Sequence, residues 1–272
     1  MLGTIYRISD KLDLATAEDV AIAEVSLKTQ FPVGYREYVT TLGNGSLDSL
    51  VNVLMPARIV SDLAGERERW AGDAPDFFDL TPLPLPRLLE SILLFTTFNG
   101  DDIVFHPDDS TTMYVLPRSE EQIYTLRGSL LDALEWACTA SMLMMREHTY
   151  VLGASGHFVE RSFYTFESFV DRRQMSFDGP PTTTFNDVQR IFTSFAKENM
   201  DTTTCVLRQD TDGDHHLQLL VKDCFADVHT LVSSHHDAKG VPIVVNCDTA
   251  RPLARLSPLL ASFKSLGYRR ID

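Results

Sequence analysis

Cysteines are few in this sequence and never lie close together. The chain of 272 residues has four, and none belongs to a Cys-x-x-Cys pair. They are Cys138, Cys205, Cys224 and Cys247. So few cysteines at such wide spacing argue against a disulfide-rich domain or a zinc ribbon. We expect reduced, buried cysteines, with a disulfide between two of the last three as the alternative.

Long apolar runs are also missing. No stretch approaches the ~18 apolar residues that a membrane helix needs. The first 13 residues carry Arg7, Asp10, Lys11 and Asp13 and lack the apolar centre of a signal peptide. These features predict a cytoplasmic protein with no membrane partner.

None of the common catalytic motifs is complete. Residues 43–45 have no third glycine at the spacing of a dinucleotide fingerprint, and neither a GxxxxGK[ST] phosphate loop nor an HExxH motif occurs. Residues 153–156 are one residue short of a GxSxG nucleophile elbow. Residues 210–214 look like a calcium loop, but His215 and Val221 stand where an EF-hand needs glycine and a carboxylate. We therefore predict no catalytic residue and no cofactor.

One segment is rich in possible metal ligands. Within 23 residues it contains His215, His216, His229, His235, His236 and Asp237. Histidine and carboxylate together can bind zinc. Adjacent histidines on a strand point to opposite faces, so only one of each pair could reach a common site. We expect surface histidines and no metal, and a metal-dependent enzyme in the C-terminal half remains the less favoured alternative.

Acidic residues are abundant, and they are unevenly distributed. Residues 1–150 contain 11 Lys and Arg against 23 Asp and Glu, a net charge of −12, whereas residues 151–272 contain 13 against 15, a net charge of −2. A negative field repels nucleic acid, which is bound through Lys and Arg. It attracts basic proteins and accelerates their association. Solubility alone is the simpler explanation of the same charge.

The first half starts with helical signals. Thr16 and Asp19 have the spacing of a capping box and predict a helix that continues to Leu27. Pro32 opens a second, short helix, which Gly43 ends. After a strand over 50–54 we expect a polar, irregular stretch, and then an extended surface loop over 81–86, where three prolines occur in six residues.

The strongest strand pattern follows. Apolar runs over 93–98, 103–105 and 113–116 are separated by turns rich in Asn, Gly and Asp, which predicts an antiparallel meander. A helix over 129–146 closes this unit.

The second half has its own pattern after a break at 149–156. It predicts an amphipathic helix around 188–195, a hairpin of strands 204–208 and 217–221, a strand over 241–245, and a last helix from Ser257 to Gly267. The predicted fold class is α+β, in two domains of residues 1–148 and 157–272, the second smaller and without an assigned role.

Several short segments of the first half occur in an order that resembles a known family. The segment Phe31 to Tyr38 reads FPVGYREY, and the turn after it reads LGNGS. Residues 94–101 read LFTTFNGD and lead into two further strands, and Trp136 lies in the closing helix. Together these segments resemble the SUKH superfamily of bacterial toxin-immunity proteins, over residues 1–147. The motif positions are Phe31, Pro32, Tyr35, Tyr38, Gly43, Asn44, Gly45, Gly100, Asp101 and Trp136.

The resemblance implies an α+β domain with an antiparallel or mixed sheet and flanking helices. It also implies binding and neutralisation of a bacterial toxin, often a nuclease, although the superfamily includes eukaryotic regulatory members. Most motif residues are expected to pack in the core, and the glycines to occupy unusual backbone conformations. A cytosolic regulatory or scaffolding module is the alternative function.

Acidic residues are the candidate partner-binding residues, because the expected toxin domain is basic. Turn aspartates commonly serve local hydrogen bonding, which is the competing explanation. The candidates are Glu66, Glu68, Asp73, Asp76, Asp79, Asp101, Asp102, Asp108 and Asp109.

Overall fold

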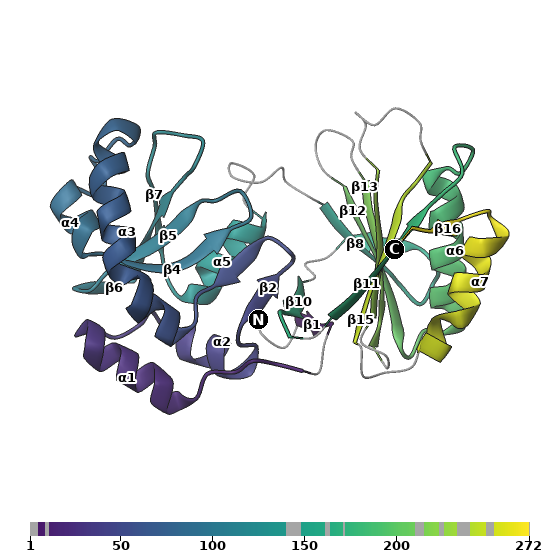
Figure 1. The fold of residues 1–272 in the computed structure, drawn as a ribbon, viewed down its shortest axis with the longest axis horizontal. Coiled ribbons are helices and arrows are strands. Elements are labelled where there is room, and N and C mark those ends of the chain that lie inside the picture. Colours follow the sequence, from purple (N-terminus) through teal and green to yellow (C-terminus); the bar gives the residue numbers. More distant parts are fainter. Residues whose placement is uncertain are drawn as a thin grey trace. The chain divides into compact units, whose positions relative to one another are not determined.

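The chain folds into two units, each built around its own antiparallel sheet (Figure 1). The computed structural model describes residues 5–8, 11–139, 148–160, 164–170, 172–209, 215–222, 226–232, 240–248 and 253–271. Unit 1 comprises residues 1–3, 12–144 and 166–169, and unit 2 comprises residues 4–11, 145–165 and 170–272. The described residues contain seven α-helices, so the fold class is mixed α+β. Independent folding of residues 1–148 and 157–272 stays a prediction.

In unit 1, strands β2 to β7 are neighbours in chain order and all antiparallel. They are β2 (Gly45–Leu47), β3 (Val51–Val53), β4 (Ile92–Thr97), β5 (Asp102–His106), β6 (Asp109–Leu116) and β7 (Tyr124–Arg127). The last part of β10 (Tyr164–Ser168) pairs with β2. The meander β4–β5–β6 confirms the strongest strand prediction. Every residue of β5 is buried, so both faces of the sheet centre are covered.

Five helices accompany this sheet. They are α1 (Ala17–Leu27), α2 (Tyr35–Thr41), α3 (Pro56–Phe77), α4 (Leu85–Glu90) and α5 (Leu130–Thr139). Helix α3 contacts β4, α4 contacts β5, and α5 contacts β3 and β7. The predicted capping box begins α1, since Asp19 N donates to Thr16 Oγ1 and Thr16 N donates to the Asp19 carboxylate. The predicted end of α5 at residue 146 lies outside the described residues.

Two sequence predictions in this unit are wrong. The polar stretch expected to be irregular is the 22-residue helix α3. Its glycines and Pro75 are residues typical of loops, which led to the wrong prediction. Pro56, however, occupies the first turn of the helix, where proline is tolerated. Ile59, Trp70 and Ala74 form a buried stripe along one side of the helix. The proline-rich loop is also partly helical, because α4 starts directly after Pro84.

Unit 2 has an antiparallel sheet in the order β16-β11-β15-β14-β13-β12-β8-β9. Its strands are β8 (His148–Leu152), β9 (Phe158–Glu160), β11 (Arg172–Asp178), β12 (Thr203–Gln209), β13 (His215–Val221), β14 (Ala226–Val232), β15 (Ile243–Asp248) and β16 (Arg269–Arg270). The pairing of β12 with β13 confirms the predicted hairpin, whose turn lies outside the described residues.

Helices α6 (Phe185–Glu198) and α7 (Ser257–Ser265), the latter preceded by a 3-10 turn (Leu253–Leu256), lie on one side of this sheet (Figure 1). Phe192 and Phe263 pack with the inner residues of β11 to β15 in the core of the unit. The N-terminal strand β1 (Ile5–Arg7) leads into a small second cluster, in which Ile8 packs with Val206 and Leu220.

No helix among the described residues has both the length and the apolar character needed to cross a bilayer.

Candidate binding pocket and acidic residues of unit 1

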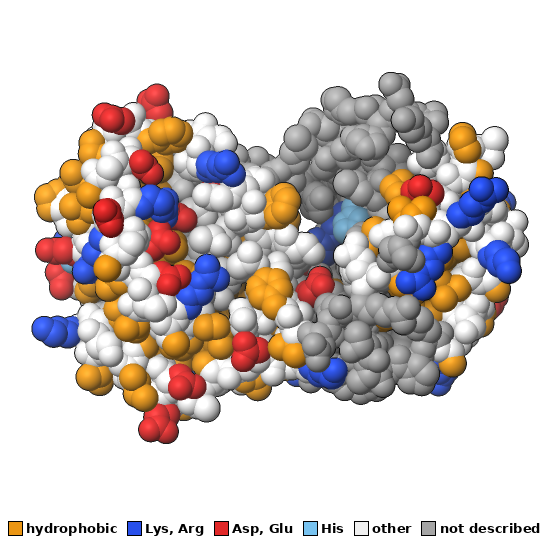
Figure 2. Space-filling view, viewed as in Figure 1, with side chains coloured by type: hydrophobic (Ala, Val, Ile, Leu, Met, Phe, Trp, Pro, Cys, Tyr) orange, Lys and Arg blue, Asp and Glu red, His pale blue; other side chains and the backbone are white. Residues whose placement is uncertain are grey.

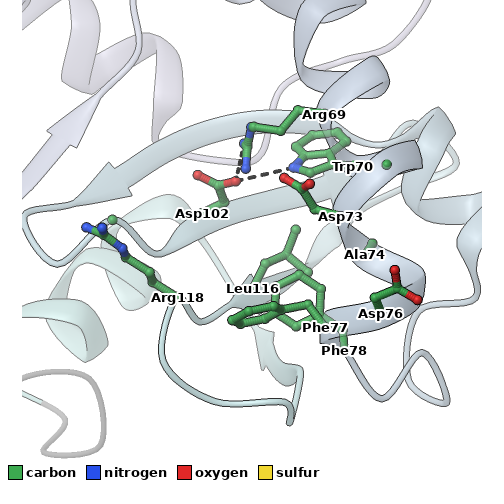
Figure 3. A pocket seen from close by; sticks show the side chains of 12 residues that line it. Arg69, Trp70, Asp73, Ala74, Asp76, Phe77, Phe78, Asp102, Leu116 and Arg118 are labelled. Atoms are coloured by element: carbon green, nitrogen blue, oxygen red, sulfur yellow. Dashed lines mark hydrogen bonds and ion pairs between the residues drawn. The ribbon is translucent and has the colours of Figure 1, made fainter.

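A pocket of about 390 Å³ lies in unit 1, where the C-terminal half of α3 faces the ends of β5 and β6 (Figure 3). Its lining combines aromatic rings with charges of both signs. It is lined by Arg69, Trp70, Gly72, Asp73, Ala74, Asp76, Phe77, Phe78, Gly100, Asp102, Leu116 and Arg118. Pockets of this size commonly take a side chain or a small ligand.

The inner wall is a hydrogen-bonded group centred on Asp102. Its Oδ2 accepts from the Arg69 guanidinium and, at 3.2 Å, from Trp70 Nε1. Arg69 also pairs with Glu66, and its guanidinium carbon lies 5.8 Å from the centre of the Trp70 ring. Trp70 is 1% exposed and Asp102 is 8% exposed. Burial raises the pKa of the Asp102 carboxyl, and the hydrogen bonds from Arg69 and Trp70 oppose this shift.

The two oxygens of Asp102 differ in their surroundings. Every hydrogen bond that the described residues make to this carboxylate reaches Oδ2. Oδ1 therefore keeps its acceptor capacity at a residue that lines the pocket.

Aromatic side chains form the apolar part of the pocket. The rings of Phe77 and Phe78 meet edge to face, with centroids 5.6 Å apart. Phe77 is 49% exposed, although it is a large apolar side chain, and Leu116, which also lines the pocket, is buried. An exposed aromatic ring in a concave site is characteristic of an interaction surface.

The rim carries charges without partners of their own. The side chains of Asp73, Asp76 and Arg118 are exposed and make no hydrogen bond or ion pair with the part of the chain that the structure describes. Figure 3 shows Asp73 directed from α3 toward Asp102, and Arg118 on the opposite side of Asp102 from Asp73. Gly100 makes room for Arg118, because a Cβ there would lie 3.0 Å from Arg118 Cδ, and its φ of +88° also favours glycine.

The structure separates the candidate acidic residues into different environments. Asp101 is 3% exposed, and its carboxylate accepts from Thr97 Oγ1 and, at 2.9 Å, from the Arg118 backbone N–H. Asp101 and Asp102 therefore do not contribute to an exposed acidic surface. Their place after a glycine turn suggested exposure, but both carboxylates turn inward to hydrogen-bond donors.

The second pair of turn aspartates lies away from the pocket lining. Asp109 accepts from the Thr111 backbone N–H at 3.0 Å and from its hydroxyl, and these hydrogen bonds lower the pKa of Asp109 to about 2. Asp108 is exposed, and its backbone N–H donates to His106 Nδ1 at 3.2 Å. Nε2 of His106 lies 3.1 Å from Glu90 Oε2.

The candidates near α3 are better placed for a partner. Asp73 and Asp76 line the pocket, and Glu66 contacts it through Arg69. Glu68 is exposed on α3 outside the lining. Asp79 is exposed just after the helix and accepts from the Thr81 backbone N–H at 3.0 Å.

The aromatic motif residues lie in the core of unit 1. Phe31 stacks on Tyr35 with ring centroids 4.1 Å apart, and the Tyr35 hydroxyl donates to the Leu54 carbonyl at 2.8 Å. Tyr38 packs edge to face on Phe166. Pro32 is buried as well, and Trp136 is partly buried against Tyr124. The four buried residues therefore pack the fold and are not available as contacts, whereas Trp136 keeps part of its surface exposed.

The motif turn after α2 depends on close backbone approach. Gly43 has a φ of +78°, and a Cβ there would lie 2.1 Å from the Asp13 carbonyl oxygen. Asn44 Nδ2 donates to the Asp13 carboxylate at 3.1 Å. A Cβ on Gly45 would lie 2.3 Å from the Glu167 carbonyl oxygen, so glycine is needed where β10 meets β2.

The remaining sequence candidates lie mainly in unit 2. His215 and His216 are on β13 and His229 is on β14, whereas residues 235–237 are outside the described residues. Within the described residues, no three potential ligands gather at a metal-binding distance. Cys205 and Cys247 are buried, Cys138 of unit 1 is partly buried, and none of these three cysteines is in a disulfide; Cys224 lies outside the described residues.

The residues that supply the aromatic rings and the guanidinium groups of the pocket lining were not predicted from the sequence. Arg69, Trp70 and Phe77 belong to α3, and Phe78 follows as its C-terminal cap. Once the helix is recognised, the seven-residue separation of Trp70 and Phe77 places these two on the same side. Arg118 follows β6 in the chain and lines the pocket together with residues of α3, which no local sequence pattern reveals.

Comparison of the chain with protein-family models, with curated proteins and with solved structures gives no match.

Proposed function

We propose that this chain is a non-enzymatic immunity-type protein of the cytoplasm, which binds a basic protein toxin through the carboxylates of the α3 segment and neutralises it by covering its working surface. The observation that carries the proposal is the group of exposed carboxylates around an aromatic pocket. In this group Asp73 and Asp76 have no partner among the described residues.

Charge supports a basic partner. Residues 1–150 hold 23 acidic against 11 basic side chains. Figure 2 shows Asp and Glu side chains spread over the visible face of unit 1, with Lys and Arg between them. Carboxylates that are exposed and unpaired keep their field in solution, which favours the approach of a cationic surface.

The pocket indicates that the proposed interface would use aromatic contacts as well as electrostatic attraction. Exposed Phe77 lies beside a rigid wall in which Trp70 and Asp102 are held by hydrogen bonds. Aromatic side chains in or beside a concave site commonly supply much of the affinity of a protein interface, and surrounding charges set its orientation and rate. The SUKH resemblance supplies the toxin as the kind of partner.

The test begins with the full chain purified from its native host at low salt, and identification of the protein bound to it. That protein is then produced alone and with this chain in a growth assay. A basic, growth-inhibiting partner whose effect disappears when this chain is present would support the proposal. A harmless partner would contradict it and favour a regulatory or scaffolding module.

A further inference from the structure

We propose that the unit 1 pocket binds an arginine side chain of the protein partner, with the guanidinium between the free carboxylate oxygen of Asp102, the Asp73 carboxylate and the exposed face of Phe77. This inference rests on the proposed function and specifies the group that the pocket would recognise.

Asp102 provides the fixed acceptor. The residue is 8% exposed, and Arg69 and Trp70 both bond to Oδ2, which fixes the orientation of the carboxylate. Oδ1 is left at the pocket with an unused acceptor. Because the carboxylate is already held in place, a ligand that donates an N–H to Oδ1 meets an acceptor of fixed orientation and does not have to order a mobile side chain.

Asp73 provides a second acceptor from the same helix as Trp70. Its side chain is directed toward Asp102, whereas that of Asp76 points away from the phenyl rings (Figure 3). Two carboxylates on one side of a pocket match the several N–H donors of a planar guanidinium better than a single-point charge such as an ammonium.

Phe77 provides the surface on which the guanidinium plane can stack. The ring is 49% exposed, and its neighbour Phe78 supports it edge to face. Arginine stacks on aromatic faces through cation–π attraction and is weakly hydrated, so it loses less than lysine on entering the site.

The balance of charge favours a cation over an anion. The lining contains the carboxylates of Asp73, Asp76 and Asp102 and the guanidiniums of Arg69 and Arg118. Arg69 is already paired with Asp102 and Glu66, which is outside the lining. Arg118 is the unpaired cation of the lining, and Asp102 lies between it and Asp73 (Figure 3).

The experiment uses the full chain with ¹⁵N-labelled tryptophan and follows the two indole N–H signals by NMR. Trp70 lines the pocket and bonds to Asp102, while Trp136 packs on Tyr124 outside the pocket lining and serves as an internal reference. The probes are N-acetyl-arginine amide and the citrulline analogue, which has nearly the same shape without the charge.

We expect the arginine probe to shift the Trp70 signal and leave Trp136 unchanged, with the citrulline analogue binding about tenfold more weakly. Asp73→Asn and Phe77→Ala should each weaken binding of the arginine probe. The matched control Glu18→Gln removes the same charge from an exposed position of α1 outside the lining and should leave it unchanged.

Three results would overturn the inference: no shift of Trp70, an equal shift with citrulline, or equal binding of N-acetyl-lysine amide, which would indicate a site for any cation. The proposed function would survive each of them if the identified toxin were still bound and neutralised. If instead the arginine probe binds as expected and no basic toxin is found, the proposed function fails and the pocket assignment remains.

Discussion

At the scale of single residues, Asp102 was identified as a candidate site residue from the sequence, but its exposure was predicted wrongly. Its position in an Asn-Gly-Asp-Asp turn suggests an exposed acid, yet the side chain is buried and bonded to Arg69 and Trp70 of α3. The burial depends on two residues of α3 that lie more than 30 positions earlier in the chain. Tyr35 and Tyr38 were more predictable, because large aromatics in a short amphipathic helix are usually buried.

Asp102→Asn should lower the free energy of unfolding by about 1–2 kcal/mol, because the charge-assisted hydrogen bonds from Arg69 and Trp70 are weakened while part of Arg69 remains solvated. Urea denaturation measures the change. Asp73→Asn, at an exposed position on the same pocket, should alter the free energy by less than about 0.5 kcal/mol. An Asp102→Asn variant as stable as the parent would show that the group contributes no net stability.

The lowered pKa of Asp109 predicts how the free energy of unfolding changes at acid pH. Hydrogen bonds from Thr111 and Thr112 lower its pKa to about 2, below the ordinary value of 3.8. A carboxyl whose pKa is depressed by folding stabilises the fold above its unfolded pKa and loses that contribution as the pH falls through its folded pKa. Between about pH 4 and pH 2 the parent should therefore lose more unfolding free energy than Asp109→Asn. Parallel pH dependence of the two proteins would rule out this contribution.

At the scale of elements, helix α3 is the largest difference between the predicted and the observed structure. Its polar composition, two glycines and Pro75 obscured a stripe of buried residues that recurs at helical spacing. Strands β4 to β6 and helix α6 were predictable because their apolar periodicity is strong. Strands β2, β8, β11 and β14 were missed, since short or partly polar strands are defined by their partners rather than by their own sequence.

Substitutions at two glycines test helix α3 and the pairing of β10 with β2, and they should change the stability of unit 1 in opposite directions. Gly65 lies within α3 and a Cβ there would meet nothing within 4 Å, so Gly65→Ala should stabilise unit 1 by about 0.5–1 kcal/mol through helix propensity. Gly45→Ala should destabilise it by at least about 2 kcal/mol, because the new methyl group would meet the Glu167 carbonyl and the Phe166 ring. Thermal and urea unfolding would measure both, and a stabilising Gly45→Ala would contradict the observed approach of β10 to β2.

At the scale of the whole molecule, charge is the feature that the sequence predicted most directly. The net charge of −12 over residues 1–150 follows from composition alone, and so does the expectation of a basic partner. The pocket could not be foreseen, because it joins α3 to the ends of β5 and β6, which are distant in sequence. Among the candidate acidic residues, only the fold distinguishes the exposed Asp73 and Asp76 from the buried Asp101 and Asp102.

The most direct test of the central claim is the rate at which the full chain associates with its identified toxin, measured across a salt series. The triple variant Glu68→Gln, Asp73→Asn, Asp76→Asn is compared with Asp178→Asn, Glu198→Gln, Asp201→Asn, which removes the same number of charges from unit 2. The Debye length falls from ~30 Å at 0.01 M salt to ~10 Å at 0.1 M, so electrostatic steering should fade over that range. At low salt the first variant should associate about tenfold more slowly than the parent, while the second should differ little. Equal rates for the two variants, or an association rate indifferent to salt, would contradict binding through the carboxylates of the α3 segment.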